Sequence, residues 1–196
     1  MAALYVALVH GPVLNKHGDR ITTAVTGLNI HDIARAVTTF GGSGYLLVTP
    51  LPTQQRLVRR IIGHWEGGFG SRYNPNRKEA LAAVRVADTL ADAAALVAGA
   101  EGAQPTVVAT SARAVDGVPP VAYAALRRRL AAGGPPVLLV FGTGWGLAPE
   151  VMAGVDALLP PILGPVDYNH LSVRSAVSII LDRLAGDRET DLTERY

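Results

Sequence analysis

The sequence contains no cysteine, which excludes disulfide bonds, thiol nucleophiles and zinc–thiolate sites. It also has no apolar run near the ~20 residues that a membrane-spanning helix needs. The start, Met1–Leu4, lacks the basic segment of a signal peptide. Charge is scarce as well, at 17% of residues against an average of about 25%. We therefore expect a soluble, cytoplasmic protein.

Hydrophobic residues, in contrast, make up 49% of the 196 residues. A chain of this length and composition can bury a full core and is typically one domain. The net charge of +2 is too small to indicate a nucleic-acid partner by itself. The basic residues are nevertheless clustered, because Lys and Arg outnumber the acids between Pro52 and Ala80 and recur at Arg127–Arg129.

Strand-like apolar segments alternate with amphipathic helical segments along the chain. The predicted strands are Leu4–His10, Tyr45–Val48, Thr106–Ala109, Val137–Phe141 and Ala157–Leu159. The predicted helices cover about 30–40, 53–64, 89–99, 119–130 and 171–184. This alternation is typical of an α/β fold with a mainly parallel sheet and helices on both faces. We predict a single domain over residues 1–186 and a charged tail over 187–196.

Local signals give finer expectations for the helices. Asn29 is a suitable N-cap for the helix that begins at Ile30. In the next helix we expect Leu57, Ile61 and Ile62 to face the core, with a loop over Trp65–Asn76.

Ligands of parallel sheets bind at the carboxyl ends of the strands, so the loops after strands are the places to search. The segment Phe141–Leu147 follows a buried strand, and its three glycines let backbone groups approach a ligand closely. It lacks the Gly-Lys-Ser/Thr ending of a phosphate loop and the G-x-G-x-x-G spacing of a dinucleotide site. A tight strand-to-helix turn explains the segment equally well.

Two further segments carry residues suited to a site. Leu159–Arg174 begins with a rigid turn of Pro, Ile and Leu that could enclose a flat ring, although it could also be a packed connection with a capping residue. Asn29–Arg35 places Arg35 on about the same side of a helix as Asp32, where the two could form no more than a surface ion pair.

The segment His64–Arg77 interleaves aromatic residues, glycine and arginine. This mixture suits stacking on unpaired bases with phosphate contacts. Alternatively, Trp65 and Tyr73 plug the core or form a subunit contact. We find no Ser-His-Asp arrangement, no H-E-x-x-H motif and no carboxylate cluster in the sequence, so no metal is expected.

In combination, these segments resemble a known family. The stretches Ala24–Arg35, His64–Gly67, Tyr73–Pro75, Phe141–Leu147 and Asp167–Ala176, in this order, resemble the SPOUT (SpoU–TrmD) class of S-adenosylmethionine (SAM)-dependent RNA methyltransferases, and within it the bacterial RNA methyltransferase type 4 group. The resemblance extends from Leu4 to about Gly186. It implies a C-terminal trefoil knot, SAM as cofactor, a homodimer with a shared active site, and structured RNA, with tRNA as the expected substrate.

The resemblance also implies roles for individual residues. For the cofactor, these are Gly142, Thr143, Gly144 and Gly146 on the methionine and ribose side, Ile162, Leu163, Gly164 and Leu171 around adenine, and Thr110, Phe141 and Pro161 beside them. Proton removal is expected from Asp167, from His170 or with the help of Arg35. For substrate binding, the resemblance implies Asn29. The pattern of charge and aromatic residues independently predicts that Arg56, Arg59, Arg60, Trp65, Arg72, Tyr73 and Arg77 position phosphates and bases.

Two positions depart from the pattern of SpoU-type 2′-O-methyltransferases. Thr143 stands where those enzymes have Glu, and His170 stands where they have Asn. The acceptor can therefore be a ribose 2′-hydroxyl or a base nitrogen, whose proton Asp167 could take. Three alternatives remain: a non-catalytic RNA-binding knot protein, a SAM enzyme acting on a small molecule, and a plain nucleotide-binding α/β protein.

Overall fold

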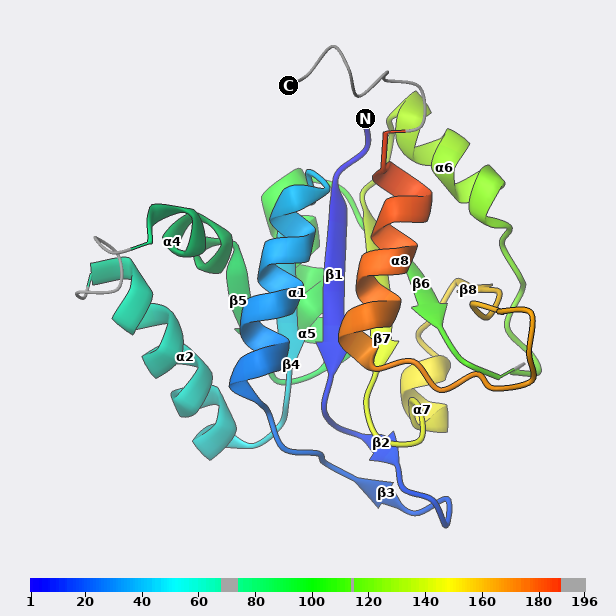
Figure 1. Ribbon diagram of the computed structural model, residues 1–196, viewed down its shortest axis with the longest axis horizontal. Coiled ribbons are helices and arrows are strands. Elements are labelled where there is room, and N and C mark those ends of the chain that lie inside the picture. Colours follow the sequence, from blue (N-terminus) through cyan, green and yellow to red (C-terminus); the bar gives the residue numbers. More distant parts are fainter. Residues whose placement is uncertain (68–73, 114, 188–196) are drawn as a thin grey trace.

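A six-stranded parallel sheet forms the centre of the protein (Figure 1). The computed structural model describes residues 1–67, 74–113 and 115–187. The strands are β1 (Leu4–Val9), β4 (Gly44–Val48), β5 (Val84–Ala87), β6 (Thr106–Thr110), β7 (Val137–Gly142) and β8 (Ala157–Leu159). Their order is β5-β4-β1-β7-β6-β8, and each neighbouring pair is parallel. The predicted α/β fold is thus confirmed.

Helices cover both faces of the sheet. One face packs against α1 (Gly27–Thr39), α2 (Pro52–Gly67), α4 (Pro75–Ala82), α6 (Tyr123–Ala132) and α8 (Val173–Ala185). The other face packs against α5 (Leu90–Glu101) and the short α7 (Pro149–Met152). A small antiparallel hairpin, β2 (Val13–Leu14) with β3 (Arg20–Ile21), lies beyond the end of β1. Among the described residues, no helix is long and apolar enough to cross a membrane.

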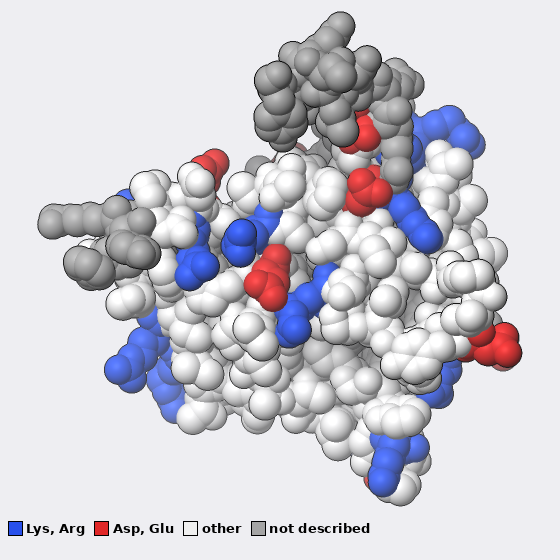
Figure 2. Space-filling model, viewed as in Figure 1, with Lys and Arg blue, Asp and Glu red and all other residues white. Residues whose placement is uncertain are grey.

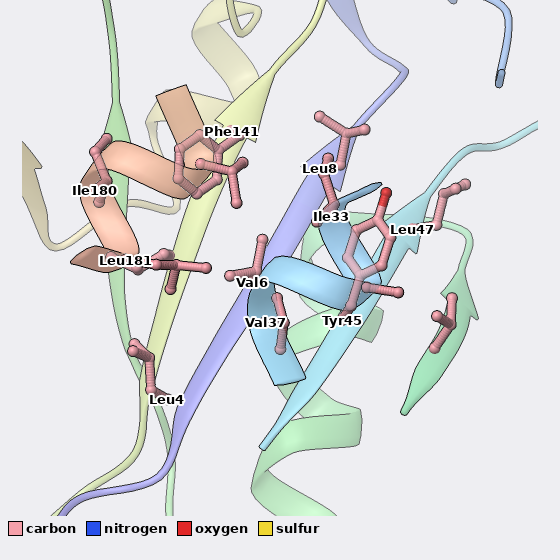
Figure 3. Close-up of a cluster of buried hydrophobic side chains, with 14 of the residues drawn as sticks. Leu4, Val6, Leu8, Ile33, Val37, Tyr45, Leu47, Phe141, Ile180 and Leu181 are labelled. Carbon is pink, nitrogen blue, oxygen red and sulfur yellow. The ribbon is translucent and has the colours of Figure 1, made fainter. Parts of the chain in front are cut away.

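The core on the α1 and α8 face is fully buried. Figure 3 shows side chains of β1, β4 and β7 meeting those of α1 and α8. Val6, Leu8 and Phe141 from the strands are at most 1% exposed, and Ile33 and Leu181 from the helices are 0% exposed. Strands buried on both faces require nearly continuous apolar sequences, which explains why these strands were recognisable.

Several local expectations were wrong in detail. The N-cap of α1 is Thr26 rather than Asn29, because the Thr26 side chain accepts a hydrogen bond from the Asn29 backbone N–H. The helix therefore begins three residues earlier, and Asn29 lies inside its first turn, buried. In α2, Ile62 is buried and Ile61 packs against the core as predicted, but Leu57 is 45% exposed and Val58 is buried in its place.

The predicted loop over Trp65–Asn76 is largely helical where it is described. Helix α2 continues to Gly67, and α4 begins at Pro75 with Asn74 as its N-cap. Strand β5, which follows α4, was also missed, because four residues at the edge of a sheet give a weak pattern.

The C-terminal part of the chain passes through a loop of the chain itself. Leu158 of β8 donates a hydrogen bond to Pro119 O and accepts one from Val121 N, both 2.9 Å, while the other edge of β8 pairs with β6. Strand β8 therefore lies inside the loop formed by β6, its connection to α6, and β7. The chain enters this loop from the α7 face and continues to α8 on the opposite face. This threading, rare in proteins, is what the knot implied by the resemblance requires.

Candidate functional site

A cavity of about 1130 Å³ opens beside the carboxyl ends of β1, β6 and β7, where parallel sheets bind their ligands. Six parts of the chain line it: the segment from the end of β1 to the start of α1, the β6–α6 connection, the glycine-rich loop after β7, α7, the strap 160–172 that leads into α8, and α8 itself. Many predicted site residues meet there. They are Asn29, Thr110, Phe141, Gly142, Thr143, Gly144, Gly146, Ile162, Asp167, His170 and Leu171.

The glycine-rich loop is held by the β2–β3 hairpin. Leu14 donates a backbone hydrogen bond to Gly146 O and accepts one from Trp145 N, both 2.8 Å. Gly144 has φ +60, and a Cβ added there would lie 2.7 Å from Leu14 O. A glycine is thus required at this position both by its backbone conformation and by the close approach of the hairpin.

The Thr143 side chain is engaged with the protein rather than directed to a ligand. Its hydroxyl donates to Val9 O at 3.0 Å and lies 2.6 Å from the Thr23 hydroxyl. Thr143 therefore anchors the loop to the end of β1. With this hydroxyl satisfied, the backbone of Thr143 is the part that remains to contact a ligand.

The strap 160–172 is tied to the β6–α6 connection and to α6. Asn169 donates its amide N–H to Ala112 O at 2.9 Å, and the Tyr123 hydroxyl donates to Pro160 O at 3.1 Å. Ile162 and Leu171 of the strap line the cavity. The other predicted cofactor residues of the strap, Pro161, Leu163 and Gly164, lie outside the lining, and Leu163 is 70% exposed.

The three predicted catalytic residues are separated by the structure. Asp167 and His170 line the cavity, and the His170 ring packs edge-on against Tyr168 at 5.4 Å. Arg35 is exposed on α1 and does not line the cavity of its own chain.

Asp32 does not form the considered pair with Arg35, because its carboxylate binds Arg174 of α8 at 3.2 Å. Arg174 also donates to the Asn29 side chain at 3.4 Å. Arg174 thereby joins the beginnings of α1 and α8 and holds Asn29 at the cavity wall.

Of the predicted substrate-binding residues, Asn29 lines the cavity, whereas Arg56, Arg59, Arg60, Trp65 and Arg77 lie outside it. Arg56, Arg59 and Arg60 are exposed on α2, and Figure 2 shows basic side chains along that edge of the molecule. Trp65 is half-buried, with the Arg77 guanidinium 4.9 Å from its ring centroid. Arg72 and Tyr73 lie outside the described residues.

The His31 ring, 5.7 Å from that of Trp65, completes this cluster. Burial, and then the positive charge of Arg77, lower the pKa of His31.

His10 is among the cavity residues that the sequence analysis did not identify. His10 follows β1 directly and is 0% exposed, and burial lowers the pKa of its imidazole from 6.5 to about 4. Its Nδ1 lies 3.0 Å from the Thr23 hydroxyl. A polar residue at the carboxyl end of a strongly apolar strand was the signal that could have identified it.

Comparison with known proteins places nearly the whole chain in a family. The family of SAM-dependent RNA methyltransferases matches residues 3–186. A tRNA (guanine-N(1)-)-methyltransferase of Nitratidesulfovibrio vulgaris is 46% identical over 184 residues, which are 94% of this chain and 42% of that protein. An uncharacterized protein of Aquifex aeolicus is 38% identical over 188 residues, covering 96% of this chain and 91% of that one. The chain thus spans less than half of the first relative and nearly all of the second.

Solved structures share the fold at low sequence identity. A putative methylase family protein from Neisseria gonorrhoeae matches with a TM-score of 0.62 at 18% identity, over 97% of this chain and 84% of that one. A TrmH/SpoU tRNA modifying enzyme of Aquifex aeolicus matches with a TM-score of 0.51 at 14% identity, over 94% and 73%. These neighbours confirm the architecture predicted from the resemblance.

Proposed function

The chain belongs to the family of SAM-dependent RNA methyltransferases, and we propose that its substrate is tRNA and that the cavity beside β1, β6 and β7 binds the methyl donor. Support for tRNA comes from the relatives named tRNA (guanine-N(1)-)-methyltransferase, which are 46% and 45% identical to this chain. Because the chain covers only 42% of each of them, the shared part need not carry the activity in their name.

The cavity residues fit the chemistry of SAM. Small-molecule pockets usually have volumes of about 300–1,000 Å³, so the space of about 1130 Å³ can hold the cofactor beside an acceptor group. Ile162 and Leu171 offer apolar contacts for a flat ring, and the glycines of the loop expose backbone N–H and C=O groups. The carboxylate of Asp167 suits a positively charged ligand. When bound, SAM supplies an electrophilic methyl group on a sulfonium sulfur.

The protein's own contribution is positioning and proton removal. The loop anchored by Thr143 and the hairpin holds its backbone groups in place before a ligand arrives, which lowers the entropic cost of reaction. Asp167 or His170, both in the cavity lining, takes the proton from the attacking base nitrogen or ribose 2′-hydroxyl.

A homodimer is part of the proposal. Arg35 is exposed and outside its own cavity, so its catalytic role requires the cavity of a second copy. Large apolar side chains are exposed near the beginnings of α1 and α8, where a second copy would cover them. These are Leu28, Leu163, Val166, Tyr168 and Leu171.

Calorimetry and methyl incorporation test the proposal together. We expect the purified protein to bind SAM and S-adenosylhomocysteine, but not ATP or NAD, and to transfer labelled methyl groups to tRNA. Ile162→Arg should abolish cofactor binding, because Ile162 lines the cavity, whereas Leu96→Arg on the exposed surface of α5 should not.

The outcomes separate the alternatives. Failure of the wild type to bind either compound would contradict the proposed site. Binding without methyl incorporation into tRNA would favour the non-catalytic RNA-binding protein, and transfer to a small molecule alone would favour the SAM enzyme acting on a small molecule.

A further inference from the structure

His10 lies at the floor of the cavity, at the end of the central strand. Val9, the preceding residue, pairs with Gly142 of β7, so His10 is adjacent to the start of the glycine-rich loop. Leu4, Val6 and Leu8 point toward the α1 and α8 face, and by alternation His10 points to the same face. Ala24 and Asn29, which line the cavity from that side, precede and begin α1.

A chain of hydrogen bonds lets us assign the tautomer of the imidazole. Thr143 donates its hydroxyl proton to Val9 O, which leaves its oxygen to accept from the Thr23 hydroxyl at 2.6 Å. The Thr23 hydroxyl also has His10 O as a possible acceptor at 3.3 Å, and with either acceptor its oxygen is left to accept from His10. We therefore assign the proton of the 3.0 Å contact to His10 Nδ1. In a neutral imidazole the second nitrogen, Nε2, is consequently a bare acceptor.

This acceptor has no partner within the protein. Among the described residues, four buried side-chain atoms lack a hydrogen bond: His10 Nε2, His31 Nδ1, Tyr45 Oη and Arg77 Nε. Of these four residues, His10 is the one that lines the cavity. An unpaired buried polar atom costs free energy, and at the wall of a ligand site a donor from the ligand removes that cost.

We propose that His10 is a substrate-binding residue, whose Nε2 accepts a hydrogen bond from an N–H or O–H group of the acceptor nucleotide. The inference rests on the proposed function. The nucleotide is favoured over SAM because the α1 side of the cavity is formed by Ala24 and Asn29, which are not among the residues expected to hold the cofactor. Held neutral by burial, His10 recognises a donor group and leaves proton removal to Asp167 or His170.

The first test measures how His10→Phe changes tRNA recognition. Removing the acceptor should raise the KM for tRNA about tenfold, as expected when a ligand donor is left unpaired, with little change in the affinity for S-adenosylhomocysteine. His10→Gln, whose amide oxygen can accept at a similar reach, should restore part of the loss. His17→Phe makes the same change at an exposed histidine outside the cavity lining; it is the matched control and should leave the KM for tRNA unchanged.

The second test observes the ring directly by ¹⁵N NMR of histidine-labelled protein. We expect Nε2 of His10 to resonate as an unprotonated nitrogen in the free protein and with S-adenosylhomocysteine. Its resonance should shift when an unmodified tRNA transcript is added to that complex.

A shift caused by S-adenosylhomocysteine alone would assign the contact to the cofactor and overturn the proposal. An unchanged KM in His10→Phe, in a preparation whose wild type methylates tRNA, would also overturn it. A wild type that neither binds the cofactor nor methylates tRNA would contradict the proposed function itself.

Discussion

At the residue scale, the site depends on polar contacts between positions far apart in the sequence. The hydrogen-bond chain His10–Thr23–Thr143 joins the end of β1, the segment before α1 and the glycine-rich loop. Arg174 likewise connects α8 with Asn29 and Asp32 of α1. None of these partners could be assigned from spacing, because hydrogen bonds over such separations exist only after the sheet has formed.

Burial of His10 predicts a specific pH dependence of stability. The unfolded chain takes up a proton near pH 6.5, whereas the folded protein does so only near its lowered pKa of about 4. The folded state is therefore favoured fully above pH 6.5, and this contribution is lost as the pH falls from 6.5 to about 4. The expected loss is roughly 3 kcal/mol in the free energy of unfolding.

Urea denaturation between pH 7 and 4 measures this effect. His10→Gln should show a clearly smaller decline over the same range, with a residual part from His31, whose pKa is also lowered. Equal declines in the wild type and the variant would show that His10 does not carry the effect.

At the element scale, the apolar strands next to the site were predicted well, whereas several short elements with weak patterns were not. Strand β8 has the predicted bounds. Strand β7 ends one residue later than predicted, and β1 ends one residue earlier. The β2–β3 hairpin was missed, because each of its strands is two residues long. This hairpin nevertheless matters for the site, because it holds the glycine-rich loop through Leu14.

Gly144→Ala tests the contact between the hairpin and the loop. The added Cβ would combine a positive φ with a 2.7 Å approach to Leu14 O, so the loop must move. We expect a loss of about 1–3 kcal/mol in stability together with a clear loss of S-adenosylhomocysteine affinity, measured by urea denaturation and calorimetry.

Gly18→Ala provides the matched control. Gly18 has φ +86, but nothing lies within 4 Å of an added Cβ. Gly18→Ala therefore has the same kind of backbone strain as Gly144→Ala but lacks the close contact. This variant should lose some stability and keep wild-type cofactor affinity. Loss of affinity in both variants would contradict the role given to the Leu14 contact.

At the scale of the whole molecule, charge is distributed unevenly despite a net charge of only +2. The arginines of α2 form an exposed basic edge beyond β5, while the cavity lies at the carboxyl ends of β1, β6 and β7 (Figures 1 and 2). A large RNA can contact both, since phosphate contacts position a substrate at a distance from the reacting nucleotide.

The double variant Arg59→Ala/Arg60→Ala should weaken tRNA binding and flatten its dependence on salt. Each lost phosphate contact reduces the slope of log K against log salt by about 0.9, so a change of up to about 2 is expected in filter-binding titrations. Arg128→Ala/Arg129→Ala on α6 removes the same charge elsewhere and should leave the slope near that of the wild type. An unchanged slope in the α2 variant would remove this edge from the RNA footprint.

The sequence by itself determined the α/β class, most of the long elements, and the family. Buried strands need apolar runs, and backbone-binding loops need glycine, so both leave marks that are readable locally. Through the resemblance it also indicated eleven of the residues that line the cavity.

Only the tertiary structure decided which of these residues share a cavity, that Arg35 lies outside it, and that His10 belongs to it. It also shows how β8 passes between β6 and residues 119–121. The physical reason is the same in each case. The cavity walls and their hydrogen-bond partners depend on contacts between segments more than 100 positions apart. The threading depends on the order of the strands in the sheet. No periodicity in the chain encodes either of these.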